Sequence, residues 1–247
     1  MELQEFFKTY PKAALGFSGG VDSAYLLYAA KKYGCNIQPY YIKTQFQPEF
    51  ELRDADRLCR ELKIELKIIP YNILLIPNVV KNPKNRCYFC KANLFSALRE
   101  QAVKDGYTTI IDGTNASDDS CDRPGMKALC ELNVLSPLRL CGLTKSDVRR
   151  LSKDAGLFTW NKPSYACLAT RIPTGSIIKQ EMLQYIEASE NILTEMGYSD
   201  FRVRYFNGSA KIQLKKEQFE KAFKERKELV RHLKPYFESV LLDLEER

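Results

Sequence analysis

Short apolar runs alternate with amphipathic segments along the first half of the chain. The runs have the length of buried strands and lie at 12–17, 37–44, 66–73 and 107–115. Between them, apolar residues recur at helical spacing in 23–34, 51–64 and 91–106. This alternation predicts an α/β fold with a doubly wound parallel sheet, which binds ligands at the carboxyl ends of its strands.

The pattern is less regular beyond Cys121. A helix is predicted at 144–157, with Thr144 or Ser146 as its cap, and a proline-punctuated loop at 158–176 is long enough to be functional. The remainder predicts a small α+β domain with helices at 179–196 and 216–233 and strands at 201–206, 210–214 and 238–244. We therefore interpret 1–175 as the α/β domain and 176–247 as the second domain, for substrate binding or oligomerisation.

Composition narrows the class of protein. With 45% hydrophobic and 28% charged residues, the 247-residue chain is typical of globular proteins. No apolar run approaches the roughly 20 residues of a membrane span, and the N-terminus does not have the pattern of a signal peptide. We expect a cytoplasmic protein with reduced cysteines and no membrane partner. The net charge of +7 permits an anionic partner, although the lysine-rich segment 215–234 is equally typical of a solvated helix face.

The stretch GFSGGVDS, residues 16–23, joins a predicted strand to a predicted helix. Its two glycines allow a tight turn and close approach of a ligand, while Ser18, Ser23 and the helix N-terminus offer hydrogen-bond donors to phosphate. Asp22 would repel phosphate by itself, so we interpret it as a ligand of Mg²⁺. The alternative is a plain glycine turn.

SGGVDS after an apolar strand resembles the PP-loop ATP pyrophosphatases. The resemblance implies that the protein uses ATP with Mg²⁺ to adenylate a substrate, releasing pyrophosphate and later AMP. It also implies that residues following the second and fourth strands lie near the nucleotide. The expected ATP-binding residues are Gly16, Phe17, Ser18, Gly19, Gly20, Asp22, Ser23, Thr44, Gly113 and Thr114.

Three of the eight cysteines are candidates for chemistry. Cys87 and Cys90 lie three apart at the start of a predicted helix, a spacing compatible with half a zinc site, a redox dithiol, two ligands of an iron–sulfur cluster, or packing. Cys167 lies in the proline-punctuated loop. The others are interpreted as packing residues: Cys35, Cys59, Cys121, Cys130 and Cys141.

Two longer blocks, at 112–138 and 160–175, resemble the LarE family of ATP-dependent sulfur transferases, which act in synthesis of the nickel-pincer nucleotide cofactor. The resemblance implies adenylation of a carboxylate of a pyridinium dicarboxylate mononucleotide and its conversion to a thiocarboxylate. Some family members sacrifice the sulfur of one cysteine, and others hold a [4Fe-4S] cluster on three. Cys87, Cys90 and Cys167 match the second kind and are the expected catalytic and cluster-binding residues. A zinc site would need a fourth ligand, for which His232 in a charged helix is a poor candidate.

Further substrate contacts are expected in the second half. Arg202 and Arg204 alternate on a predicted strand and face one side, where the resemblance implies binding of the substrate phosphate. Trp160 and Arg171 are candidate walls of the substrate pocket. Gln213 stands where the family usually has an acidic residue, so any contact carried by that acid is in question.

The expected partners are a small-molecule nucleotide substrate, a sulfide-donating protein and further copies of the chain. Two alternatives stay open. One is a PP-loop tRNA thiolase with a three-cysteine cluster, against which the lack of zinc-ribbon cysteine pairs speaks, so nucleic acid is not expected as a partner. The other is a nucleotide-binding sensor without turnover.

Overall fold

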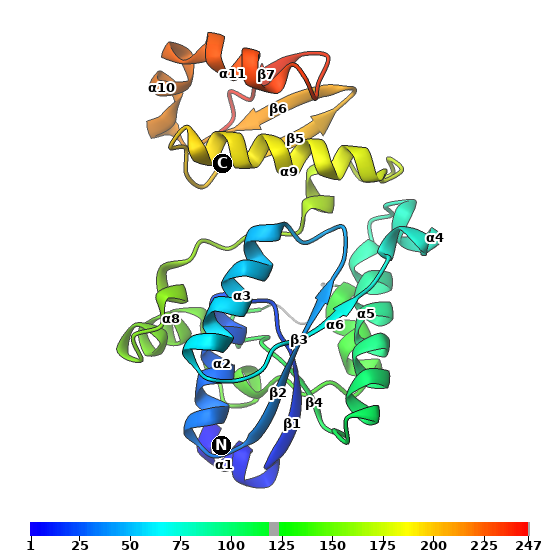
Figure 1. Ribbon diagram of the computed structural model, residues 1–247, viewed down its shortest axis with the longest axis vertical. Helices are drawn as coiled ribbons and strands as arrows, with labels where there is room; N and C mark the ends of the chain where they lie inside the picture. The colour runs from blue at the N-terminus through cyan, green and yellow to red at the C-terminus, as the bar shows by residue number, and fades with distance from the viewer. Residues whose placement is uncertain (119–123, 247) are drawn as a thin grey trace. The chain divides into compact units, whose positions relative to one another are not determined.

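The computed structural model describes residues 1–118 and 124–246 and divides into two compact units (Figure 1). The first unit consists of Met1–Ile73 and Asn85–Tyr165, and the second of Leu74–Lys84 and Ala166–Arg247. Cys121 lies outside the described residues.

The first unit contains the predicted parallel sheet. Its strands are β1 (Lys12–Gly16), β2 (Asn36–Lys43), β3 (Lys67–Pro70) and β4 (Ile110–Asp112), in the order β3-β2-β1-β4. Every neighbouring pair is parallel. The α/β prediction is confirmed.

Helices cover both faces of this sheet (Figure 1). On β1, Ala13 and Leu15 face a core shared with α2 (Val21–Lys32) and α3 (Glu49–Glu61), whereas Ala14 faces a second core with α5 (Arg86–Lys104). Because successive strand residues point to opposite faces, strands buried on both sides read as the continuous apolar runs seen in the sequence.

Further helices complete the first unit. They are α1 (Leu3–Thr9), α6 (Pro124–Glu131), α7 (Pro137–Leu140), α8 (Lys145–Asp154) and the 3₁₀ turn η2 (Phe158–Asn161). Thr144 caps α8, since its side chain accepts a hydrogen bond from the N–H of Asp147, whose carboxylate in turn accepts from Thr144 N–H. Helix α6 packs along α5 (Figure 1).

The second unit has a small mixed sheet with the order β5-β6-β7, made of β5 (Arg202–Phe206), β6 (Ser209–Gln213) and β7 (Val240–Leu242). β5 and β6 are antiparallel, and β7 is parallel to β6. Helix α9 (Gln180–Glu195) packs against β5. The predicted helix at 216–233 is interrupted at Glu225, which separates α10 (Phe219–Lys224) from α11 (Arg226–Leu233); η4 (Lys216–Gln218) precedes them.

Residues 74–84 join this second unit although they are distant from it in the chain. This segment begins within the 3₁₀ turn η1 (Ile73–Leu75) and contains α4 (Pro77–Val80). The main segment of the second unit begins at Ala166 and contains the 3₁₀ turn η3 (Leu168–Arg171). The buried Asn82 side chain donates to the carbonyl of Pro173 at 2.8 Å, and Ile178 N–H donates to Val80 O at 2.9 Å. These hydrogen bonds attach residues 74–84 to the second unit, and no local sequence pattern indicates this attachment.

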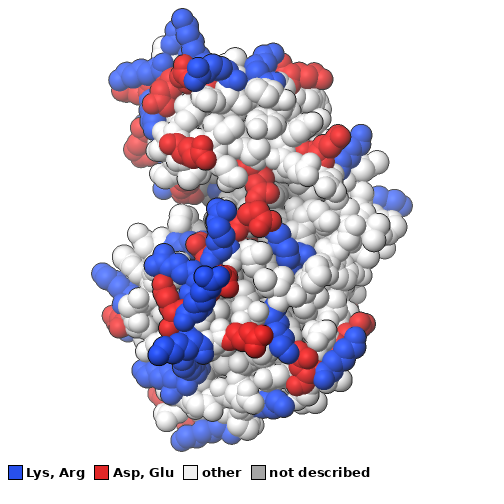
Figure 2. Space-filling model, viewed as in Figure 1, with Lys and Arg blue, Asp and Glu red and all other residues white. Residues whose placement is uncertain are grey.

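Charges of both signs occur together on one face of the molecule. On the face shown in Figure 2, Lys and Arg side chains stand beside Asp and Glu in each unit. Within the described residues, no helix is both long and apolar enough to cross a membrane.

Candidate functional site

Three loops meet at the carboxyl edge of the parallel sheet. They follow β1, β2 and β4, and they carry the PP-loop motif, Thr44 and the sequence Gly113–Thr114 respectively. Parallel strands end at one edge of a sheet, which is where α/β folds of this kind bind ligands. Gly16 is the last residue of β1, and Phe17 N–H continues the ladder by donating to Tyr40 O.

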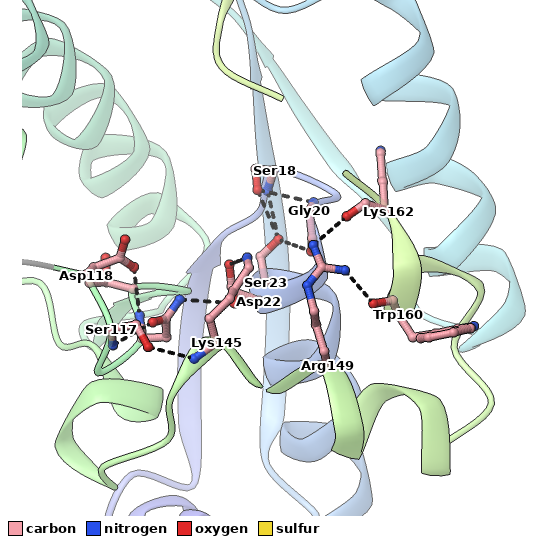
Figure 3. Close-up of polar contacts among 12 residues, drawn as sticks. Ser18, Gly20, Asp22, Ser23, Ser117, Asp118, Lys145, Arg149, Trp160 and Lys162 are labelled. Carbon is pink, nitrogen blue, oxygen red and sulfur yellow. Dashed lines mark hydrogen bonds and ion pairs between the residues drawn. The ribbon is translucent and has the colours of Figure 1, made fainter. Parts of the chain in front are cut away.

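The PP-loop is held by its own serines. Ser18 Oγ and Ser23 Oγ are 3.1 Å apart, Gly20 N–H donates to Ser18 Oγ, and Ser23 Oγ donates to Gly20 O (Figure 3). Gly19 has φ +70°, a left-handed conformation that side-chain-bearing residues rarely adopt, and it packs against Ala55 of α3. The first helical bond of α2 runs from Ala24 N–H to Gly20 O, so the N–H groups of residues 21–23 precede the helical ladder and can face an anion.

The loop after β4 lies directly against the start of α2. A Cβ on Gly113 would be 2.8 Å from Ser23 N, so only glycine allows this approach. The buried Asp112 orders the loop by accepting hydrogen bonds from Thr114 Oγ1 and Ser136 Oγ. The structure therefore brings Gly113 and the PP-loop together.

Asp22 is held by two residues that the sequence interpretation did not single out. Its carboxylate accepts hydrogen bonds from Lys145 Nζ at 2.5 Å and from Asn115 Nδ2 at 3.2 Å (Figure 3). Asn115 follows β4, in the segment expected near the nucleotide. Lys145 begins α8, and a lysine in the first turn of a helix gives no local signal. A single carboxylate fits magnesium that is bound together with substrate phosphates and waters.

Thr44 is buried and organises the turn after β2. Its hydroxyl donates to Gln47 Oε1 at 2.6 Å and accepts from Phe46 N–H at 3.0 Å. Both bonds are internal to the turn.

The three candidate cysteines are distributed over both units. Cys87 and Cys90 lie in the first turns of α5, with Cys87 exposed and Cys90 half-buried, and Cys167 immediately precedes η3 in the second unit. In the described part of the chain, no three metal-binding side chains come close enough to one another to hold a metal ion. Cluster binding by these cysteines stays a prediction.

Two cysteines interpreted as packing residues are buried. Burial raises the pKa of the Cys35 thiol to about 11 and that of Cys59 to about 12, which disfavours their reactive thiolates. Cys141 is half-buried. The packing prediction for Cys130 is wrong: this residue is exposed, because α6 buries Ala128 and Leu129 and turns the next position to solvent.

A cavity of about 280 Å³ in the second unit is lined in part by basic residues, two of which are ion-paired, Arg171 with Glu190 and Lys211 with Asp243. The lining includes the side chains of Arg171, Arg204 and Lys211 together with Thr170 and Tyr205. Arg204 donates to Thr170 O at 2.8 Å, and burial lowers its pKa, with the nearby Arg171 acting in the same direction.

The predicted pocket residues occupy different surroundings. Arg171 is almost fully buried and forms an ion pair with Glu190, with 2.9 Å between Nε and Oε1. Arg202 is buried and donates to Phe201 O, and it does not line the cavity. Trp160 belongs to the first unit, in η2.

Gln213 links Arg204 to an acidic residue. Its side-chain oxygen accepts from Arg204 Nε, and its amide nitrogen donates to Asp243 Oδ2 at 2.8 Å. A neutral amide thus stands between the guanidinium and the carboxylate, so the charge of Arg204 is not neutralised by residue 213.

No family model matches the chain, but individual relatives do. The protein slr1717 of Synechocystis is 36% identical over 249 residues, covering 98% of this chain and 92% of the relative. The protein MJ0830 of Methanocaldococcus jannaschii is 31% identical over 244 residues, covering 98% and 93%.

Other relatives carry functional names. Pyridinium-3,5-bisthiocarboxylic acid mononucleotide synthase of Lactiplantibacillus plantarum is 28% identical over 209 residues, covering 84% of this chain and 76% of the relative. The tRNA-specific 2-thiouridylase MnmA of Thermotoga sp. (strain RQ2) is 25% identical over 235 residues, covering 75% and 64%. The chain therefore belongs to the PP-loop family that includes slr1717 and MJ0830, and it is a distant homologue of the LarE synthase.

Proposed function

We propose that the protein is an ATP-dependent sulfur transferase that adenylates a carboxylate of a pyridinium dicarboxylate mononucleotide and converts it to a thiocarboxylate. The observation that carries the proposal is the organised PP-loop, with Asp22 held by Lys145 and Asn115 at the carboxyl edge of the sheet. The similarity to pyridinium-3,5-bisthiocarboxylic acid mononucleotide synthase supports the choice of substrate class.

The proposed reaction has two displacements. A carboxylate oxygen of the substrate attacks the α-phosphorus of ATP, and pyrophosphate leaves. A sulfide sulfur then attacks the carbonyl carbon of the acyl adenylate, and the C–O bond to AMP breaks. The N–H groups at the start of α2 would bind the polyphosphate, and Asp22 would hold its Mg²⁺.

Cys87, Cys90 and Cys167 are proposed to hold a [4Fe-4S] cluster. Three thiolates fit such a group chemically, because they leave one iron open to carry the sulfide that is transferred. A sulfide-donating protein is the proposed source of further sulfide.

The substrate phosphate is proposed to bind at Arg204 and Lys211. Both line the cavity of the second unit, where guanidinium and ammonium groups favour a phosphate. Arg202 of the same strand does not line this cavity, so its contact with the phosphate is proposed from the resemblance alone, as are contacts of Trp160 and of Arg171 with the substrate. We also propose that the active protein is a homo-oligomer.

The cluster is tested by iron and sulfide content and a visible spectrum after purification without oxygen. We expect about four irons per chain and a visible absorption band, both lost in Cys90→Ala and kept in Cys130→Ser. Cys130 is the matched control because it is an exposed helical cysteine outside the proposed set. Colourless protein that binds one zinc or no metal would contradict the cluster and make Cys167 a candidate for sacrificial sulfur donation.

The two steps of the reaction are separated by product analysis. Cys87→Ala, Cys90→Ala and Cys167→Ala should each abolish thiocarboxylate formation while substrate-stimulated pyrophosphate release continues. Unimpaired sulfur transfer by any one variant would remove that cysteine from the proposal. Absence of pyrophosphate release in the unmodified protein would instead favour a nucleotide sensor.

A tRNA thiolase is the second candidate, and the similarity to MnmA favours it. Against it, the sequence contains no zinc-ribbon cysteine pairs. Transfer RNA binding that weakens steeply with salt would support this alternative, because neutralised phosphates release counterions.

A further inference from the structure

Lys162 lies beside the PP-loop, outside the residues assigned to the nucleotide above. Its ammonium is 2.6 Å from Asp54 Oδ2 on α3 and 3.5 Å from the carbonyl oxygen of Gly19. The side chain is only 16% exposed, and its ammonium lies over the ring of Phe50 at 5.4 Å. The positive charge of Lys162 is therefore positioned beside Gly19 of the PP-loop.

Arg149 of α8 fixes the backbone that carries this lysine. Its two terminal nitrogens donate to the carbonyl oxygens of Trp160 and Lys162, each at 2.8 Å (Figure 3). A guanidinium that makes two such bonds has a defined orientation, because its donors form a planar fork. The turn after η2 is thereby tied to α8.

The same helix carries the cation on the other side of the motif. Lys145 and Arg149 are four residues apart, so they lie on one face of α8. Lys145 reaches Asp22 directly (Figure 3). Arg149 acts through the backbone of Lys162, whose ammonium lies 3.5 Å from Gly19 O. Helix α8 thus positions two ammonium groups around the PP-loop.

We propose that Lys162 is a nucleotide-contacting residue that exchanges Asp54 for a phosphate oxygen of ATP, and that Arg149 is its positioning residue. The inference rests on the proposed ATP use. A polyphosphate beside Gly19 would be repelled by the Asp54 carboxylate, and the ammonium between them screens that repulsion. The flexible four-carbon stem of lysine allows the ammonium to move from one anion to the other.

A purely structural role makes a different prediction from nucleotide contact. If the Lys162–Asp54 pair serves only to tie the loop to α3, removing either partner has the same effect. If Lys162 binds phosphate, removing Asp54 leaves the ammonium available and reduces the negative charge nearby. Lys162→Met and Asp54→Asn therefore separate the two roles.

The experiment is calorimetric titration with α,β-methylene-ATP and Mg²⁺, without any sulfur acceptor. We expect Lys162→Met to weaken binding by roughly 10- to 100-fold, the equivalent of one charge-assisted hydrogen bond. Lys162→Arg should restore most of the affinity, Arg149→Met should lower it, and Asp54→Asn should bind as tightly as the unmodified protein or more tightly. Urea unfolding of each variant checks that the fold is kept.

Two results would overturn the inference: unchanged affinity in Lys162→Met, or equal losses in Lys162→Met and Asp54→Asn. Either can occur while the unmodified protein still binds the analogue, which leaves the proposed function standing. An unmodified protein that binds no nucleotide would remove both the proposed function and the role of Lys162.

Discussion

Asp22 and Lys145 lie 123 positions apart in the chain and form an ion pair with 2.5 Å between Oδ2 and Nζ. The backbone of Lys145 is itself fixed, because its N–H donates to Ser117 Oγ at 2.9 Å and Thr144 caps the helix that it begins. The PP-loop carboxylate therefore has a positioned counter-charge, which a magnesium-bound polyphosphate would share.

The first prediction concerns this lysine. Lys145→Met should lower pyrophosphate release by about 100-fold, because a positioned positive charge beside the reacting phosphates is lost. Stability should fall by no more than about 1 kcal/mol, since the pair is partly exposed. Arg150→Met, on the same helix but with its side chain 63% exposed, is the control and should leave the rate within about twofold. Equal rates in both variants would contradict a role for Lys145.

Gly113→Ala tests the close approach of the β4 loop to α2. The added Cβ would meet Ser23 N at 2.8 Å, so the backbone must shift, and we expect a loss of about 1–3 kcal/mol in the free energy of unfolding. Gly20→Ala is the matched control, because its Cβ would have no neighbour nearer than 3.4 Å. Urea denaturation measures both. Similar stabilities for the two variants would show that the loops can separate without cost.

The buried ion pair of Arg171 and Glu190 should contribute strongly to the stability of the second unit. Glu190 also accepts a hydrogen bond from Val203 N–H at 3.0 Å, so the carboxylate connects α9 to β5. Arg171→Met should lower the free energy of unfolding by about 3–5 kcal/mol, because the buried Glu190 carboxylate loses its ion pair with the Arg171 guanidinium. The double variant with Glu190→Gln should recover part of this loss in urea denaturation. A double variant as unstable as the sum of the single variants would mean that the two residues act independently.

Local pattern accounts for most of the fold. The runs around Leu15 and Ile111 predicted buried parallel strands correctly, since burial on both faces leaves a continuous apolar signal. The prediction for 216–233 missed the break at Glu225, where the chain is equally rich in helix-forming residues on either side. There the side chain of Glu225 accepts from Tyr198 Oη at 3.0 Å, a tertiary contact that the helical pattern does not contain.

Fewer of the site residues than of the fold elements could be predicted from the sequence. The glycines and serines of the PP-loop are adjacent in the chain, so their joint role is visible locally. Lys145, Arg149 and Lys162 contact residues of other segments. Lys145 and Arg149 lie on a helix, where a lysine or arginine normally indicates a solvated face, and Lys162 follows the short turn η2. Only the tertiary structure distinguishes them from the other cations of a chain with 38 lysines and arginines.

The last prediction is a dependence of stability on pH at the far end of α5. Asp105, which follows this helix, accepts hydrogen bonds from Lys67 Nζ at 2.8 Å and Tyr40 Oη at 2.6 Å. The bond from Lys67, followed by that from Tyr40, lowers the pKa of Asp105 to about 2. The folded state therefore favours the carboxylate more strongly than the unfolded state does.

The sign of the effect follows from this difference. Because the folded pKa lies below the ordinary value of 3.8, the stabilisation is fully present above that value and is lost as the pH falls through about 2. Asp105→Asn should thus be less stable than the unmodified protein at pH 7, and the two should converge towards pH 2 in urea denaturation. Asp154→Asn, whose ion pair with Arg150 is exposed and 4.0 Å long, is the control and should differ by no more than about 0.5 kcal/mol at pH 7. A gap between Asp105→Asn and the unmodified protein that persists unchanged at pH 2 would mean that the aspartate stabilises the fold through packing, not through its charge.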